Sequence, residues 1–354
     1  LLGLNDFPGQ GSAIIGLLDA FYGEKGYITP KETRRFCGPT VPLARIPKFT
    51  YKNDEIFHAT IEVSHFGNAV LDSTKTTYTI RDEYGKIYYK EISNNRTIPV
   101  GNCIQLGEVN YPLASITSPA KLNLEVCIEG THFANDWDFW VYPAVVETNQ
   151  GNVYITDTFN EKALETLASG GNVLITAARK ITYGQGIVQQ FTPVFWNTSW
   201  FKMRPPHTTG IWVNNNHPLF KNFPTEYHSN LQWWELLNNA QVMLFSDFAY
   251  EFEPLVQSID TWFLSRKIGT LFEAHVLNGK LMMTSMDITT DLDNRIVARQ
   301  MRKAILDYMN SPHFRPVSHV KVQQIEDLFR KPTPVINMHT KQSPEELKPS
   351  YNVK

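Results

Sequence analysis

Residues 153–176 read VYITDTFNEKALETLASGGNVLIT, and this stretch decides the fold of the second half of the chain. Val153–Thr156 and Asn172–Thr176 are short apolar runs typical of buried strands. Between them, Thr158-Phe159-Asn160-Glu161 fits a capping box, and a helix with one apolar face runs on to Gly170-Gly171. A strand, a helix and a strand in this order predict a right-handed βαβ unit with parallel strands.

Downstream of this unit the sequence predicts a hairpin and a long helix. Leu271–Val276 and Lys280–Met286 have the composition of strands, and Leu277-Asn278-Gly279 joins them as a turn. Asp291–Asn310 has apolar residues at helical spacing. The intervening segment 181–265 is rich in Trp, Pro and Asn and shows no clear period. Helices that alternate with apolar strands predict a three-layer α/β domain.

Upstream of residue 150 the hydrophobic period changes to two. Apolar and polar residues alternate, and turn residues such as Glu83-Tyr84-Gly85 separate the runs. Alternation with a turn every ~8–12 residues is typical of an immunoglobulin-like β-sandwich. The expected strands include Phe57–Val63, Thr76–Asp82, Lys86–Ile92, Ile104–Val109, Leu122–Ile128 and Asp138–Tyr142.

The first forty residues have a third pattern. Leu1–Leu4 reads as a short buried strand, and a Pro/Gly loop leads from it to Ser12, which can cap a helix over Ala13–Phe21. A second short helix is expected where Thr29 opens a capping box with Pro30 at the first helical position. Because a buried strand needs partners for its edge amides, we expect this to be the last strand–loop–helix unit of a larger domain.

These patterns predict four segments. The expected boundaries are 1–40 for the end of a (β/α)8 barrel, 41–147 for the β-sandwich, 148–312 for the α/β domain and 313–354 for a C-terminal tail with one short helix around Val322–Phe329. Hydrophobic residues make up 42% of the chain and aromatic residues 12%, which indicates packed cores. The net charge of −2 gives no electrostatic basis for nucleic-acid binding. No apolar run approaches the ~18 residues of a bilayer span, so no membrane span is expected.

The sequence lacks the usual nucleophile and phosphate motifs in its α/β domain. Cys37, Cys103 and Cys127 are too scattered for a disulfide scaffold or a zinc site. A Cys103–Cys127 bridge requires neighbouring strands, and two buried free thiols are favoured. No Gly-x-Ser-x-Gly turn occurs, and every cysteine precedes the α/β domain. No glycine lies in the loop after Val153–Thr156, so no nucleotide cofactor is expected. No pair of histidines has metal-ligand spacing on a predicted helix, so no metal is expected.

Three groups of residues are candidates for ligand contact. Asn5, Asp6 and Gln10 follow the first expected strand, where a barrel places its active-site residues; a Pro/Gly turn with a capping Asp explains them equally well. Asp136 and Asp138 lie among aromatic residues and could form a carboxylate pair, although a core plugged by Trp137, Phe139 or Trp140 with polar residues outward is favoured. The third group is rich in histidine and tryptophan, and two interpretations are open. It could form a sugar-stacking or interface surface, but a packed core with surface loops is favoured. It comprises His207, His217, His228, Trp196, Trp200, Trp212, Trp233 and Trp234.

The order of the parts resembles a known family. The stretches that carry the resemblance are 1–12, 17–22, 25–27, 34–37 and the Trp-Asp-Phe-Trp-Val-Tyr-Pro run at 137–143. Together they look like the C-terminal portion of a family 2 glycoside hydrolase of the large multidomain type found in Bacteroidetes, similar to β-galactosidases and β-glucuronidases. Residues 269–274 and 280–284 are similar to the flavodoxin-like, glutamine-amidotransferase-like domain appended to some glycosidases.

The resemblance implies retaining hydrolysis of a terminal β-linked sugar in plant, algal or host glycans by two glutamates, at the ends of the fourth and seventh barrel strands. This chain would begin at the eighth strand, so no catalytic residue is assigned to it. Asn5, Asp6 and Gln10 would bind substrate. The implied partner is a carbohydrate, the implied location of the parent protein is periplasmic or secreted, and homo-oligomerisation is left open. The alternatives are a non-catalytic carbohydrate-binding or oligomerisation module, and an autonomous hydrolase that uses the α/β domain.

Overall fold

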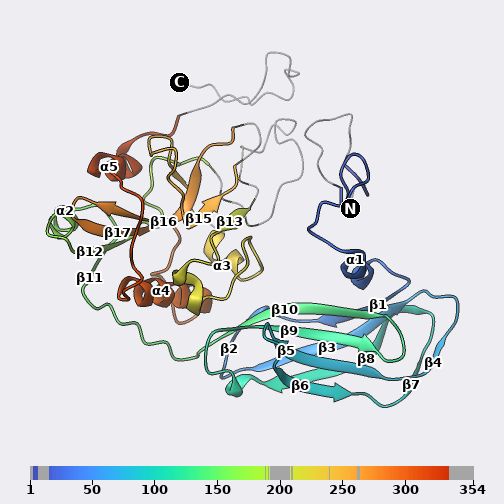
Figure 1. Ribbon diagram of the computed structural model, residues 1–354. Helices are drawn as coiled ribbons and strands as arrows, with labels where there is room; N and C mark the ends of the chain where they lie inside the picture. Colours follow the sequence, from blue (N-terminus) through green and yellow to red (C-terminus); the bar gives the residue numbers. More distant parts are fainter. Residues whose placement is uncertain are drawn as a thin grey trace. The chain divides into compact units, whose positions relative to one another are not determined.

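The computed structural model describes residues 3–6, 16–187, 189, 191, 208, 210–238, 240–260 and 264–334. The chain is mostly β-sheet with few helices, and it divides into two compact units, one ending at Val145 and the other beginning at Val146. Figure 1 labels their elements.

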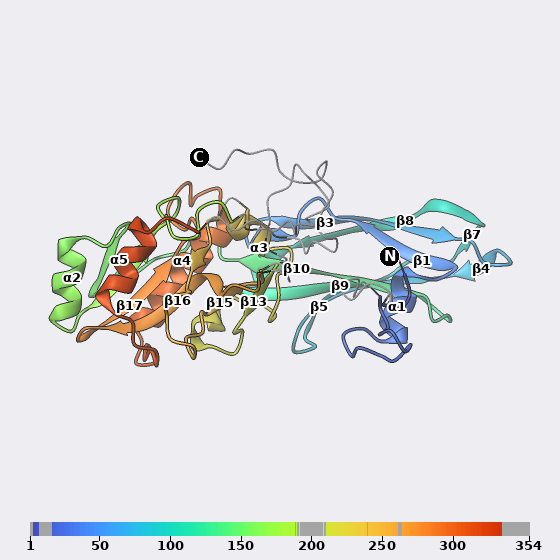
Figure 2. The same ribbon diagram turned by 90° about the horizontal axis from the view of Figure 1, so that it is seen from above.

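The first unit is a β-sandwich, as the alternating pattern predicts. Figure 2 shows its two sheets stacked as layers. One sheet has the order β1 (Thr40–Arg45), β3 (Ile56–His65) and β8 (Gly101–Pro112). The other has the order β2 (Thr50–Lys52), β10 (Ala134–Tyr142), β9 (Ala120–Ile128), β5 (Thr76–Asp82) and β6 (Ile87–Ile92). A separate ribbon pairs β4 (Leu71–Thr74) with β7 (Arg96–Ile98), and a 3-10 turn, η1 (Leu113–Ser115), follows β8.

Alternate residues of the strands fill the space between the two sheets. Along β3 every second side chain is buried, from Phe57 to Val63. The Phe57 and Phe139 rings stack with centroids 4.2 Å apart. This arrangement confirms that Phe139 plugs the core. All three cysteines are free, and Cys103 is exposed rather than buried because it lies at a solvent-facing, left-handed position of β8.

The beginning of the chain differs from its expected strand and helix. Leu4 is 55% exposed rather than buried, and Asn5 forms a single bridge with Leu18. Residues 16–21 are turns and a bridge, not a helix. The reason is local: the Asp19 carboxylate accepts hydrogen bonds from the backbone N–H groups of Phe21 and Gly23, which holds a turn in place of a helical one. The second expected helix is confirmed as α1 (Pro30–Phe36), with the Thr29–Glu32 capping box.

The second unit is built on one mixed sheet. Its strand order is β11-β12-β17-β16-β15-β13, and β14 pairs with β16. The first three strands are parallel and the others antiparallel. The bounds are β11 (Val153–Thr156), β12 (Asn172–Thr176), β13 (Ile211–Val213), β14 (Met243–Leu244), β15 (Val256–Ser258), β16 (Ile268–Val276) and β17 (Gly279–Thr284). The predicted parallel pairing of β11 and β12 is confirmed.

Helices pack on both faces of this sheet. They are α2 (Glu161–Ala168), α3 (Trp233–Leu237), α4 (Ile296–Met309), α5 (Val322–Arg330) and the 3-10 turn η3 (Pro218–Asn222). On one face, Leu167 of α2 and Leu328 of α5 share a core with Phe272 of β16. On the other, Tyr308 of α4 donates a hydrogen bond to Glu273, the next residue of β16, at 2.8 Å. Figure 1 shows α5 and α4 on either side of β17.

The start of α2 corrects one sequence assignment. The N-cap is Asn160, whose side chain accepts a hydrogen bond from Ala163 N at 2.9 Å, and not Thr158. The Thr158 backbone is held instead by Thr156, whose hydroxyl donates to the Thr158 carbonyl at 3.0 Å. Thr158 is thereby kept in the loop that precedes the helix.

Candidate functional site

The structure engages Asp6 in internal contacts. Its Oδ1 accepts hydrogen bonds from Lys25 Nζ at 2.6 Å and from Gly16 N at 2.9 Å. The hydrogen bond from the Lys25 ammonium holds the pKa of Asp6 below its usual value. Asn5 Nδ2 donates to the Asp6 carbonyl at 3.0 Å, and Gln10 lies outside the described residues. Substrate binding by these three residues stays a prediction.

The carboxylates of the aromatic run are paired with cations. Asp136 Oδ1 lies 2.5 Å from Arg35 Nη1, and Asp138 Oδ2 lies 2.8 Å from Lys121 Nζ. Asn123 Nδ2 donates to both carboxylates, at 2.9 and 2.8 Å. Their charges are therefore compensated on the face of β9 and β10, and this pair gives no support to a hydrolytic site.

The tryptophan-rich segment contributes both core and surface. Trp233 is fully buried, whereas Trp234, the next residue of α3, is 56% exposed. His217 Nε2 lies 3.5 Å from Glu273 Oε1 and 3.3 Å from the Tyr308 hydroxyl, in a partly buried contact. Trp196, Trp200 and His207 lie outside the described residues. The exposed Trp234 ring lines a pocket that no pattern in the sequence indicates.

This pocket forms where two neighbouring parallel strands end. After β12 the chain turns to the face that carries α2 and α5, with Ala177 and Ile181 in that core, and after β17 it leads to α4 on the opposite face. Adjacent strands whose connections diverge in this way open a crevice at their carboxyl ends, the usual ligand position in open α/β sheets. The crevice has a volume of about 310 Å³. We call it the strand-end pocket; it is lined by Ala178, Arg179, Trp234, Glu235, Leu236, Asn238, Ala240, Ser285, Asp287, Thr290 and Arg295.

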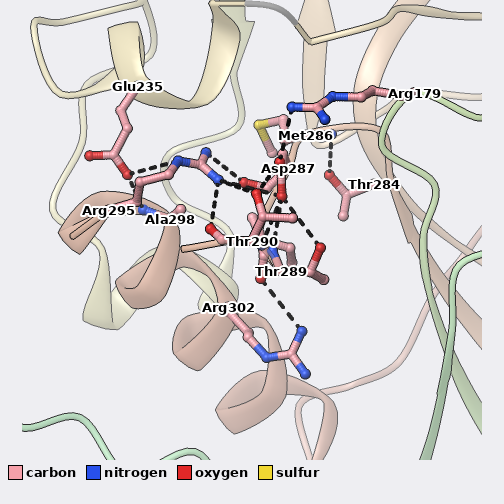
Figure 3. Close-up of polar contacts among 11 residues, drawn as sticks. Arg179, Glu235, Thr284, Met286, Asp287, Thr289, Thr290, Arg295, Ala298 and Arg302 are labelled. Atoms are coloured by element: carbon pink, nitrogen blue, oxygen red, sulfur yellow. Dashed lines mark hydrogen bonds and ion pairs between the residues drawn. The ribbon is translucent and has the colours of Figure 1, made fainter. Parts of the chain in front are cut away.

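Asp287 and Arg295 form the rigid base of the strand-end pocket. Asp287 accepts hydrogen bonds from the backbone N–H groups of Thr289 and Thr290, both at 3.1 Å, and from the Thr290 hydroxyl at 2.5 Å. Arg295 donates to the Asp287 carbonyl at 2.7 Å and to the Thr290 carbonyl at 3.1 Å. Figure 3 shows the Arg295 guanidinium reaching between Glu235 and this loop. These hydrogen bonds hold the loop after β17 against the start of α4.

The pKa values of the two carboxyl groups of the pocket are shifted in opposite directions. Burial alone would raise the pKa of Asp287, but hydrogen bonds from Thr290 and Thr289 and the charge of Arg295 outweigh it and lower the pKa to about 2. Burial raises the pKa of Glu235, although Glu235 Oε1 accepts a hydrogen bond from Ala298 N at 2.8 Å in the first turn of α4. The pocket therefore contains one permanently ionised carboxylate and one that can take up a proton more readily.

Arg179 and Trp234 form the exposed side of the strand-end pocket. Arg179 has a left-handed backbone with φ of +63° and is the third residue after the end of β12. Such a conformation is unfavourable for residues other than glycine and is concentrated at functional sites. The Arg179 side chain is 75% exposed, and its Nη2 lies 3.7 Å from Asp287 Oδ2. An exposed indole and an exposed guanidinium thus lie beside the Asp287 carboxylate at the bottom of the pocket.

This arrangement suits binding of a small polar ligand. The pocket supplies hydrogen-bond donors, acceptors and one flat apolar surface, the combination by which proteins bind sugars. Across the described residues, no group of three or more His, Cys, Asp or Glu side chains could hold a metal ion. No helix in the described part of the chain is long and apolar enough to cross a membrane.

Replacing Asp287 by asparagine is expected to make stability depend less on pH. The folded-state pKa of Asp287 lies below its unfolded value of 3.8, so its contribution is fully present above about pH 4 and is lost as the pH falls towards 2. The shift corresponds to about 2 kcal/mol. We expect Asp287→Asn to cost about that much at pH 7 in urea unfolding, and progressively less below pH 4. Asp293→Asn, which changes an exposed carboxyl in the same loop, is the control; an equal loss in both variants would contradict the assignment.

Comparison with known proteins gives two family models and several solved structures. The models are DUF8487, over residues 154–330, and DUF8488, over residues 55–143, both described as domains of unknown function. No curated protein matches the sequence. A β-glucuronidase from Parabacteroides merdae is 9% identical, with a TM-score of 0.22, and the match covers 40% of this chain and 22% of that one. The chain thus spans about a fifth of that enzyme's length.

Two further matches are also glycoside hydrolases. A β-glucuronidase from glycoside hydrolase family 2 is 11% identical, with a TM-score of 0.21, covering 29% of this chain and 11% of that one. A family 123 glycoside hydrolase from Clostridium perfringens is 10% identical, with a TM-score of 0.20, covering 40% of this chain and 35% of that one. At these scores the likenesses carry no argument about activity. The DUF8487 model, by contrast, matches half of the chain and includes every element around the strand-end pocket, and the chain belongs to this family of domains of unknown function.

Proposed function

We propose that this chain is a non-catalytic accessory part of a glycoside hydrolase and that its second unit binds carbohydrate at the strand-end pocket. The observation that carries the proposal is the exposed Trp234 ring beside hydrogen-bonding groups at the carboxyl ends of β12 and β17. An indole face stacks on the apolar face of a sugar ring, and carboxylates and guanidinium groups bind its hydroxyls.

The glycosidase parent is supported by the sequence resemblance described above. On this proposal the catalytic glutamates belong to a barrel domain of the parent glycosidase, and Asn5, Asp6 and Gln10 contribute to substrate binding. The barrel end, the amidotransferase-like ancestry of the second unit, a periplasmic or secreted location and homo-oligomerisation belong to the same proposal.

Trp234→Ala is the direct test of sugar binding. We expect wild-type protein to bind members of a panel of neutral mono- and oligosaccharides, measured by titration calorimetry. The variant should bind at least about fivefold more weakly, since an aromatic contact contributes about 1 kcal/mol or more. Tyr250→Ala is the matched control, because Tyr250 is an aromatic residue that is 91% exposed and does not line the pocket. Binding by neither wild type nor variant would reject the proposal.

A second candidate function is catalysis in the strand-end pocket itself. The specific observation is that the pKa values of Glu235 and Asp287 shift in opposite directions, a pattern shared by acid–base pairs. Against it, Arg295 lies between them, 4.0 Å from Glu235 and 3.4 Å from Asp287, as in a structural ion-pair network. Hydrolysis of nitrophenyl β-glycosides by this chain, lost in Glu235→Gln, would favour catalysis; inactivity of the chain is the result expected for an accessory part.

A further inference from the structure

The two arginines of the strand-end pocket differ in how many of their N–H groups form hydrogen bonds within the protein. Arg295 is 22% exposed and donates to the Asp287 and Thr290 carbonyls while lying 3.4 Å from the Asp287 carboxylate. Arg179 is 75% exposed, and among the residues that the structure describes its partner is the Asp287 carboxylate, at 3.7 Å, beyond hydrogen-bond distance. A guanidinium has five N–H donors. Arg179 therefore presents a charged group with donors to spare at the mouth of the pocket.

The buried Asp287 carboxylate does not need Arg179 to compensate its charge. Its oxygens already accept hydrogen bonds from Thr289 and Thr290, and Arg295 compensates its charge. A ligand anion can therefore take the Arg179 guanidinium without leaving a buried carboxylate unpaired, which would otherwise be costly. The anion would exchange a long, partly solvated contact for a short forked one.

The alternative place for an anion in this pocket is already filled. The backbone N–H of Ala298, in the first turn of α4, donates to Glu235 Oε1 at 2.8 Å. A side-chain carboxylate thus occupies the N-terminus of that helix. Arg179 is left as the group that meets a negative charge on a ligand.

We propose that the strand-end pocket prefers saccharides that carry an anionic group, a carboxylate or a sulfate, which the Arg179 guanidinium binds while the sugar ring packs on Trp234. This inference rests on the proposed carbohydrate-binding function and adds the chemical class of the ligand. Arg179 is a specificity-determining residue on this view. The planar fork of arginine matches both oxyanions, and lysine would supply the charge without the fork.

The test compares glucuronate and glucose 6-sulfate with glucose, by titration calorimetry in low salt. We expect wild-type protein to bind at least one of the two acidic sugars at least about tenfold more tightly than glucose. Arg179→Gln should abolish that preference and retain glucose binding, and Arg179→Lys should restore part of it. Arg330→Gln is the matched control, since the Arg330 side chain is also 75% exposed and lies on α5. Glucuronate and glucose 6-sulfate separate a carboxylate preference from a sulfate preference.

The outcomes distinguish failure of the anionic preference from failure of carbohydrate binding. Glucose bound as tightly as both acidic sugars, or an acidic preference that survives in Arg179→Gln, overturns the inference and leaves the carbohydrate-binding function standing. Binding of none of the three sugars, together with none of the neutral panel, overturns the proposed function and this inference with it. Because the Arg179 side chain is exposed, the variants are expected to fold, which their far-UV circular dichroism checks.

Discussion

Phe272→Ala is expected to lower the free energy of unfolding of the second unit by about 4 kcal/mol, the range for an aromatic residue removed from a close-packed core. Phe272 lies in the middle of β16 and is completely buried. Its ring is steeply inclined to those of Phe245 and Phe252, with both centroid distances 5.4 Å, and to that of Phe248, at 6.0 Å. Truncation would leave a cavity among rings that strands and turns hold in place.

Urea unfolding followed by tryptophan fluorescence measures this loss, since Trp233 is buried in the same unit. Phe272→Leu is the first control and should cost less, because leucine fills most of the volume. Tyr250→Ala, at a ring that is 91% exposed, should change the free energy by less than about 0.5 kcal/mol. A loss below about 1 kcal/mol in Phe272→Ala would show that the four rings are not packed as described.

Gly279→Ala is expected to cost about 3 kcal/mol, although it adds only one methyl group. A Cβ at residue 279 would lie 2.5 Å from the Gly171 carbonyl oxygen and 2.8 Å from Leu167 Cα. Both are backbone atoms around the end of α2, so no side-chain rotation relieves the contact. The Lys280 N–H also donates to the Gly171 carbonyl at 3.1 Å, which ties the start of β17 to this turn.

Gly101→Ala is the matched control for this overpacking. Gly101 also begins a strand, β8, and the atom nearest to its added Cβ would be Ile104 Cδ1, at 3.7 Å. That is an ordinary contact, so the control should be within about 0.5 kcal/mol of wild type. Equal losses in the two variants would mean that the end of α2 moves freely away from the sheet.

The sequence predicts those elements well whose periodicity agrees with their surroundings. The bounds of β11 and β12 match the expected runs, and β3 and β9 follow the alternation that buries every second side chain. The region Ala13–Phe21 is an apolar run that the sequence predicts as a helix, yet residues 16–21 are turns and a bridge. There the Asp19 side chain competes for backbone donors, a local effect that periodicity does not register.

The sequence predicts only part of the candidate site. Arg179 and Asp287 each follow a strand that the sequence predicts, and carboxyl ends of parallel strands are where ligands bind. What the sequence did not reveal is that β12 and β17 are neighbours, because their pairing depends on the whole order of the sheet. Trp234 and Glu235 come from a segment whose strands have two or three residues, too short for any period to be recognised.

The position of β17 between β12 and β16 also shapes how the second unit is made. The β16–β17 hairpin closes locally, within microseconds, whereas the β12–β17 pairing joins segments about a hundred residues apart and pays the larger loop-closure entropy. During synthesis β12 leaves the ribosome long before its partner exists. At translation rates of about 5–20 residues per second, its backbone edge then stays unpaired for roughly 5–20 s. An unpaired edge of an apolar strand is prone to aggregate, so we expect the β11–α2–β12 segment to be most exposed to aggregation before β17 is made.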